Sequence, residues 1–105
     1  MNERTLQWSP LARVMGLQQI ETWANQVRSD QLSQEEFTSA KRRKLGDIGL
    51  DATTPLTRVD TSPMAQATYL DVANAARTYV RSGLLTEEEY ALLRRILLYE
   101  CGILD

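Results

Sequence analysis

Two pairs of adjacent glutamates are the residues whose types and spacing most clearly allow chemistry. Glu35 and Glu36 form the first pair, and Glu88 and Glu89 form the second. Neighbouring carboxylates can act as general acid and base or bind a divalent cation. Each pair, however, follows a Ser or Thr in the spacing of a capping box, in which a hydroxyl and a carboxylate satisfy two backbone N–H groups. We therefore interpret these acids as helix-starting residues whose charge complements the helix dipole.

The sequence lacks the residue types on which many catalytic and metal sites depend. It contains no histidine and one cysteine, Cys101. Zinc sites of the Cys/His type and Ser-His or Cys-His nucleophile pairs are therefore excluded. No base is evident that would activate Cys101, and we interpret it as a packing residue. We predict no catalytic residue, no metal ligand and no cofactor, and expect that the protein is not an enzyme.

A run of four basic residues could contact phosphates. It consists of Lys41, Arg42, Arg43 and Lys44, and the surrounding unit has a helix–turn–helix outline. Against a nucleic-acid site, the net charge of the chain is −2 and no aromatic residue is interleaved with the run. Basic residues near a helix C-terminus also complement the helix dipole. We favour a solvated helix face, and DNA binding by residues 41–44 is the alternative.

The elements that carry these residues are two copies of one sequence unit. Residues 9–51 and 62–104 align without gaps at an offset of 53, and 13 of 43 positions are identical. Chance would give about three identities, at roughly one match in sixteen. The alternative, convergence of two hairpins on common capping residues, accounts for only part of the match. We predict a tandem duplication joined by a linker over residues 52–61, within a single domain over residues 1–105.

Each unit is predicted to form two helices with a short turn between them. A Ser-Pro pair opens each unit at residues 9–10 and 62–63; Ser can accept an unpaired N–H, and Pro needs no N–H at the first helical position. The predicted helices span residues 10–29, 34–46, 63–82 and 87–101. Gly46 or Gly49 in the first unit, and Gly102 in the second, can take the left-handed conformation that ends a helix. The expected fold is all-α, a four-helix domain with pseudo-two-fold symmetry.

The turn and second helix of each unit carry a recognisable pattern of residues. In the second copy the positions are Gly83, Leu85, Thr86, Glu88, Glu89, Tyr90, Arg94 and Leu98. In the first copy they are Leu32, Ser33, Glu35, Glu36, Phe37, Lys41 and Leu45, with Asp30 in place of the glycine. This pattern resembles the short C-terminal (SHOCT) domain of bacterial proteins. The resemblance covers under half of the chain, and it implies a bacterial source and a non-catalytic helical hairpin used in interaction or oligomerisation.

The first helices carry apolar stripes in which large and small residues are exchanged between the copies. Gly16 aligns with Tyr69, Ile20 with Ala73, and Trp23 with Ala76. Matched large and small side chains let two helices interdigitate at the density of a protein interior. We predict that the units pack on each other with Trp23 over Ala73 and Ala76. The alternative is that each stripe covers the second helix of its own unit. Trp8 is either a hydrophobic staple or a cover over the core.

The last predicted helix is apolar on two faces. Its second face is formed by Leu92, Ile96 and Tyr99, whereas the equivalent face of the first copy is polar. A helix that is apolar all round must be buried on more than one side. The predicted partner-binding residues are Leu84, Leu92, Ile96, Tyr99, Ile103 and Leu104. The alternative is that this helix is the central helix of the domain.

These patterns predict a non-catalytic protein–protein interaction module. We expect a small bacterial or phage regulator that binds and sequesters a protein partner, whose identity the sequence does not give. The simplest partner is a second copy of the chain, giving a homodimer. Nucleic acid is not the expected partner. The start of the chain lacks an apolar run and no stretch approaches the ~20 apolar residues of a membrane span, so we expect no membrane association and a cytoplasmic location.

Overall fold

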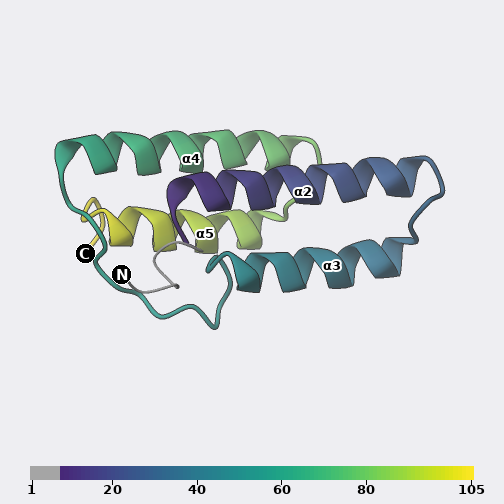
Figure 1. Ribbon diagram of the computed structural model, residues 1–105, viewed down its shortest axis with the longest axis horizontal. Coiled ribbons are helices and arrows are strands. Elements are labelled where there is room, and N and C mark those ends of the chain that lie inside the picture. Colours follow the sequence, from purple (N-terminus) through teal and green to yellow (C-terminus); the bar gives the residue numbers. More distant parts are fainter. Residues whose placement is uncertain (1–7) are drawn as a thin grey trace. The chain divides into compact units, whose positions relative to one another are not determined.

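Two helical hairpins, one from each sequence copy, make up the fold (Figure 1). The computed structural model describes residues 8–105. Within this range the helices are α2 (Pro10–Arg28), α3 (Gln34–Asp47), α4 (Pro63–Arg81) and α5 (Glu87–Glu100), and there is no strand. Helix α2 packs against α3, and α4 packs against α5. The predicted all-α fold of four helices is confirmed, and each predicted helix boundary is correct to within one residue.

The chain divides into two compact units that correspond to the two copies. Unit 1 ends at Gly49, and unit 2 runs from Leu50 to Asp105. Helices α2 and α4 each contain 19 residues, and α3 and α5 each contain 14. Each helix of unit 2 begins 53 residues after its counterpart in unit 1. The offset of the sequence repeat is therefore kept throughout the helical structure.

The helices begin as the sequence predicts. At α2 and α4 the hydroxyl of the capping serine accepts the N–H of the residue three positions later. At α3 the Ser33 hydroxyl accepts from the Glu36 N–H, while the Ser33 N–H donates to the Glu36 carboxylate. Thr86 and Glu89 repeat this reciprocal pair at α5. The capping interpretation of these glutamates agrees with the observed hydrogen bonds.

Residues in the left-handed conformation end the helices. Asp30, Gly49, Gly83 and Gly102 have φ values of 61°, 70°, 81° and 81°. Gly46 lies inside α3, so Gly49 is the glycine that ends this helix. Gly83 adopts this conformation without a steric penalty because it has no Cβ. Asp30 adopts the same conformation although its Cβ disfavours positive φ. The turn of unit 1 is therefore more strained than the turn of unit 2.

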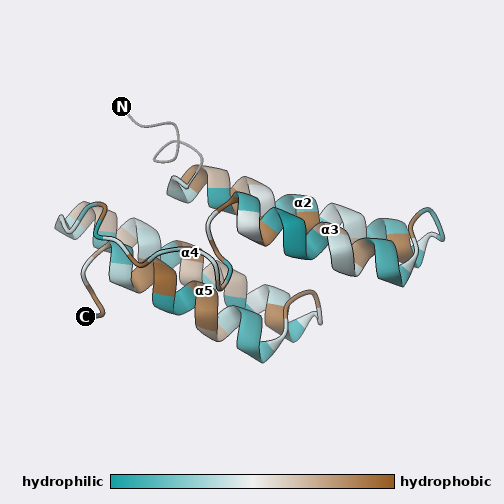
Figure 2. Cartoon of the chain, turned by 90° about the horizontal axis from the view of Figure 1, so that it is seen from below, coloured by the Kyte–Doolittle hydropathy of each residue, from teal (hydrophilic) through white to brown (hydrophobic). Residues whose placement is uncertain are grey.

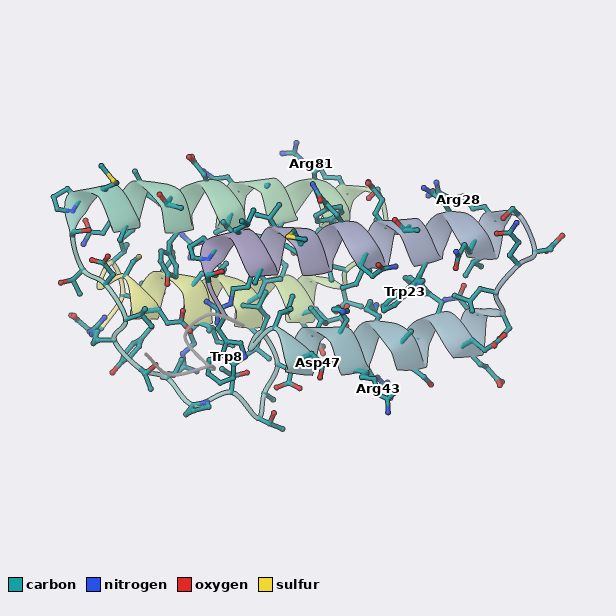
Figure 3. The ribbon with its side chains drawn as sticks, viewed as in Figure 1. Trp8, Trp23, Arg28, Arg43, Asp47 and Arg81 are labelled. Carbon is teal, nitrogen blue, oxygen red and sulfur yellow. The ribbon has the colours of Figure 1, made fainter. Side chains whose placement is uncertain are left out.

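The end of the second helix in each unit is covered by the residue before the first helix cap. A Cβ placed on Gly49 would lie 2.5 Å from the Trp8 ring, and a Cβ on Gly102 would lie 2.8 Å from Cγ2 of Thr61. Trp8 and Thr61 are equivalent at the offset of 53. Trp8 thus lies over the C-terminal end of α3 (Figure 3).

One of the exchanged pairs of large and small residues has an explanation inside each unit. A Cβ on Gly16 would lie 2.8 Å from Cδ1 and Cγ2 of Ile48, so the glycine makes room for the large residue at the end of α3. At the same positions unit 2 has Tyr69 and Cys101, both buried. There the large residue is on the first helix and the small one is at the end of the second. At this position the exchange of large and small residues is therefore explained by packing within each unit.

Apolar and polar residues alternate along the helices of both units (Figure 2), and each unit buries a set of the apolar ones. The buried apolar helix residues are Leu17, Ile20, Ala24, Phe37 and Leu45 in unit 1, and Tyr69, Val72, Ala73, Ala76, Leu93, Ile96, Leu97 and Leu98 in unit 2. Arg13, Lys41 and Glu100 are buried as well. Among the described helices, none combines the length and the hydropathy needed to cross a membrane.

Candidate interaction surface

The six residues predicted to bind a partner differ widely in exposure. Leu84 and Ile96 are buried, with 6% and 1% of their surface exposed. Leu92, Tyr99 and Leu104 are half-buried, and Ile103 is 39% exposed. Leu84 and Ile96 therefore belong to the core. Of the other four, Tyr99, Ile103 and Leu104 lie at the C-terminal end of α5, and Leu92 lies near its middle.

A segment of the predicted linker binds this end of α5. We call residues 58–60 the Arg58 strap. Nη1 of Arg58 donates to the carbonyl oxygens of Tyr99 and Leu104, each at 2.6 Å. The N–H groups of Val59 and Asp60 donate to the carbonyl of Glu100 at 2.8 and 3.2 Å. These bonds hold residues 58–60 against α5. The Arg58 guanidinium bridges the backbone carbonyls of Tyr99 and Leu104.

The Arg58 side chain also stacks on an aromatic ring. Its Cζ atom lies 4.1 Å from the centroid of the Tyr99 ring. Its Nη2 atom lies 3.6 Å from a carboxylate oxygen of Asp105. A guanidinium over an aromatic face is attracted by the ring quadrupole, and a carboxylate adds a charge interaction. The guanidinium is thus bound by a ring, two carbonyls and a carboxylate.

Electrostatics explain why a cation belongs at this position. Helix α5 has no basic residue in its last turn, and its final residue is the buried Glu100. The C-terminal end of a helix carries a partial negative charge, which cations stabilise. Arg58 supplies from the linker the positive charge that the last turn of α5 lacks.

The four basic residues of α3 do not share one face. The Lys41 Nζ atom lies 5.6 Å from the centroid of the Phe37 ring, and Lys41 is buried. The Lys44 Nζ atom lies 5.8 Å from the centroid of the Trp23 ring, which lies between α2 and α3 (Figure 3).

Arg42 and Arg43 are exposed, and Arg43 points away from α2 (Figure 3). Successive residues of a helix are rotated by about 100°, so four consecutive side chains cannot all point to the same side. Two of the four cations therefore pack against aromatic rings of unit 1, and two face solvent.

The glutamates of α3 border an open hollow on the helix surface. Its lining consists of Glu35, Glu36, Ser39, Ala40 and Arg43. The pKa of Glu36 is lowered, first by the backbone N–H of Ser33 and then by the Ser33 hydroxyl. Among the described residues, no group of three or more His, Cys, Asp or Glu side chains could hold a metal ion. Glu36 is engaged in the capping box with Ser33.

Cys101 is fully buried, and its thiol donates to the carbonyl of Leu98 at 3.5 Å. It stands at the end of α5, where unit 1 has Ile48. A buried thiol bonded to a backbone carbonyl behaves as a small packing side chain. This environment agrees with the predicted packing role.

Sequence reasoning missed the polar side chains that close the second helix of each unit. Arg13 is buried, and its Nε and Nη2 atoms donate to the carbonyls of Ile48 and Gly49, each at 2.9 Å. Its counterpart at the offset of 53, Gln66, donates to the carbonyl of Cys101 at 3.1 Å. Their alignment was the available signal, since two long polar side chains occupy the same position on otherwise apolar stripes.

Comparison of the chain with protein-family models, with curated proteins and with solved structures gives no match.

Proposed function

We propose that this chain is a non-catalytic protein–protein interaction module that binds and sequesters a protein partner and self-associates as a homodimer. The observation that supports this proposal is the apolar end of α5, where Tyr99 and Leu104 are half-buried and Ile103 is exposed. Exposed apolar residues beside a polar rim are typical of interaction sites. The end of α5 is therefore the surface that we assign to the partner.

The proposal extends to the setting in which the protein acts. Two tandem hairpins that resemble the SHOCT domain support a small bacterial or phage regulator. We place it in the cytoplasm. Its partner is a protein, and its action is to occupy the partner's surface rather than to modify it.

Sedimentation of charged variants tests this function. Ile103→Glu places a charge in the proposed surface, and Met64→Glu is the matched control because Met64 is exposed on α4. We expect the unaltered chain to self-associate, Ile103→Glu to weaken association by at least about tenfold, and Met64→Glu to leave it unchanged. A chain that remains monomeric at high micromolar concentration would contradict the homodimer, and equal effects of the two variants would contradict the assigned surface.

DNA binding is the second candidate function, and the exposed pair Arg42 and Arg43 favours it. It is the weaker candidate because Lys41 and Lys44 pack against aromatic rings. A protein that binds phosphates loses affinity steeply as salt rises. We expect no DNA binding at low salt. Salt-sensitive binding that Arg42→Ala and Arg43→Ala abolish together would instead support the DNA-binding function.

A further inference from the structure

The C-terminal ends of α3 and α5 are closed by arginines of different origin. In unit 1 the arginine is Arg13, which lies on α2 and is completely buried. In unit 2 the same position is Gln66, which donates to the Cys101 carbonyl. The arginine of unit 2 is Arg58, which lies outside the helical pair. The two equivalent ends thus differ in the origin of the guanidinium: unit 1 carries it on a helix, whereas unit 2 takes it from an extended segment.

The contacts of the Arg58 strap with α5 depend on groups that any arginine-bearing extended segment could supply. The guanidinium binds two backbone carbonyls and the Tyr99 ring, and the next two residues donate only backbone N–H groups. None of these contacts uses the side chain of Val59. Recognition therefore requires an arginine followed by two amide donors.

The strap is also only partly covered. The Arg58 side chain is 40% exposed, and Val59 is 48% exposed. A segment that buries little apolar surface is held by a few polar contacts, and such segments open locally without global unfolding. The strap can therefore leave the end of α5 while the helices stay folded.

We infer that the C-terminal end of α5 is a guanidinium-binding site. In the free chain Arg58 fills it, and in a complex an arginine on an extended segment of the partner replaces Arg58. This inference rests on the proposed function, and it adds the chemistry of the partner. Arg58 is then an intramolecular competitor, and its release uncovers Tyr99 and Leu104.

The first experiment uses guanidinium ion as the probe on the full-length Arg58→Ala chain. Amide and ring NMR signals of Tyr99 and Leu104 are followed as guanidinium chloride is added below denaturing concentrations, with sodium chloride as the ionic-strength control. We expect a saturable shift in Arg58→Ala, none in the unaltered chain, and none with sodium chloride. Absence of a saturable shift in Arg58→Ala would overturn the site.

Arg77→Ala is the matched control for stacking alone. Arg77 lies 5.2 Å from the centroid of the Tyr90 ring and 3.4 Å from the Glu87 carboxylate, and no backbone carbonyl accepts from it in the described hydrogen bonds. We expect no saturable shift at Tyr90 in this variant. A shift equal to that at Tyr99 would show that any exposed ring and carboxylate suffice, which would contradict a specific site.

The second experiment adds the strap in trans. A peptide of residues 54–62, TPLTRVDTS, should bind Arg58→Ala at least about tenfold more tightly than it binds the unaltered chain. The same peptide with alanine in place of arginine should not bind. Equal affinity for both chains would overturn the competition. Specific peptide binding by a chain that does not self-associate would retain the site and contradict only the proposed homodimer.

Hydrogen exchange in the unaltered chain gives an independent test that does not depend on the folding of a variant. The Val59 and Asp60 amides bond to α5 and should exchange faster than the amides of buried Leu93 and Leu97. Equally slow exchange would mean that the strap opens only with the whole unit, and it would overturn the inference.

Discussion

Single side chains with charge or hydrogen-bonding capacity act mainly on helix ends in this protein. Glu36 and Glu89 complete capping boxes at helix starts. Arg13 and Gln66 donate to backbone carbonyls at the end of the second helix of their unit. Arg58 donates to the carbonyl of Tyr99 near the end of α5. Helix ends leave backbone groups without partners, so each of these bonds replaces one otherwise made by water. Of the four glutamates whose spacing could allow chemistry, Glu36 and Glu89 therefore have a structural role at helix starts.

Acid should weaken the start of α3 through Glu36. The N–H and hydroxyl of Ser33 lower the pKa of Glu36 in the folded chain. A carboxyl with a lowered folded pKa stabilises the fold above its unfolded pKa, and this contribution is lost as the pH falls through the folded pKa. We expect the urea midpoint to fall below about pH 4.5. Glu36→Gln keeps an acceptor for Ser33 and should reduce this pH dependence; an unchanged pH profile would contradict the assignment.

Asp30 offers a stabilising substitution. It holds a φ of 61° where its counterpart Gly83 holds 81°, and a Cβ is unfavourable in this region. Asp30→Gly should stabilise the chain by about 0.5–1 kcal/mol, measured by urea denaturation. Gly83→Asp, the reverse change in unit 2, should destabilise by a similar amount. Destabilisation by Asp30→Gly, or stabilisation by Gly83→Asp, would refute the interpretation of the turn.

At the scale of elements, the two hairpins use one plan with different side chains. The helix lengths and the left-handed turns are the same in both. The arginine that closes α3 is carried by α2, whereas the one that closes α5 comes from the linker. The two copies therefore share one backbone plan and differ in the side chains that close the helix ends.

This divergence predicts unequal sensitivity of the two equivalent positions. Arg13→Met removes two buried hydrogen bonds to the carbonyls of Ile48 and Gly49, and it should cost about 2–4 kcal/mol. Gln66→Met removes one bond to the Cys101 carbonyl and should cost about 0.5–1.5 kcal/mol. Chemical denaturation of both variants measures the difference. Equal losses would contradict the expectation that Arg13 contributes more to closing α3 than Gln66 contributes to closing α5.

At the scale of the whole molecule, packing of the units through Trp23 on Ala73 and Ala76 stays a prediction. Trp23 is half-buried beside Lys44, and both alanines are buried. The exchange at Gly16 has an explanation inside each unit because Ile48 occupies the space that a larger residue would need. The exchanges of Ile20 with Ala73 and of Trp23 with Ala76 are the two that remain to distinguish packing between the units from packing within them.

A double-mutant cycle tests this packing. Ala76→Leu should clash with Trp23, and Trp23→Ala should relieve the clash, so the two changes should couple by about 0.5–3 kcal/mol. Trp8→Ala is the control, because Trp8 lies over Gly49 at the other end of α2. We expect no coupling between Trp8→Ala and Ala76→Leu. A coupling energy near zero for Trp23 and Ala76 would reject the predicted packing.

The sequence by itself determined the four helices, their caps and the gap-free repeat at an offset of 53. These features are local, because a Ser-Pro pair, a capping box or a glycine after a helix acts on residues a few positions away. Because the two copies align without gaps, a helix boundary predicted in one copy also predicts the equivalent boundary in the other. This is why the helix boundaries were predicted to within one residue.

Only the tertiary structure decided which of the candidate site residues lie at the surface. Ile96 and Leu84 are buried, and Lys41 is turned inward, although the periodicity of each helix allowed other assignments. Arg58 binds carbonyls 41 and 46 residues away, and no local spacing encodes such a contact. Burial and long-range hydrogen bonds depend on how distant segments pack together. For that reason the binding of Arg58 to the end of α5 could be identified only in the folded chain.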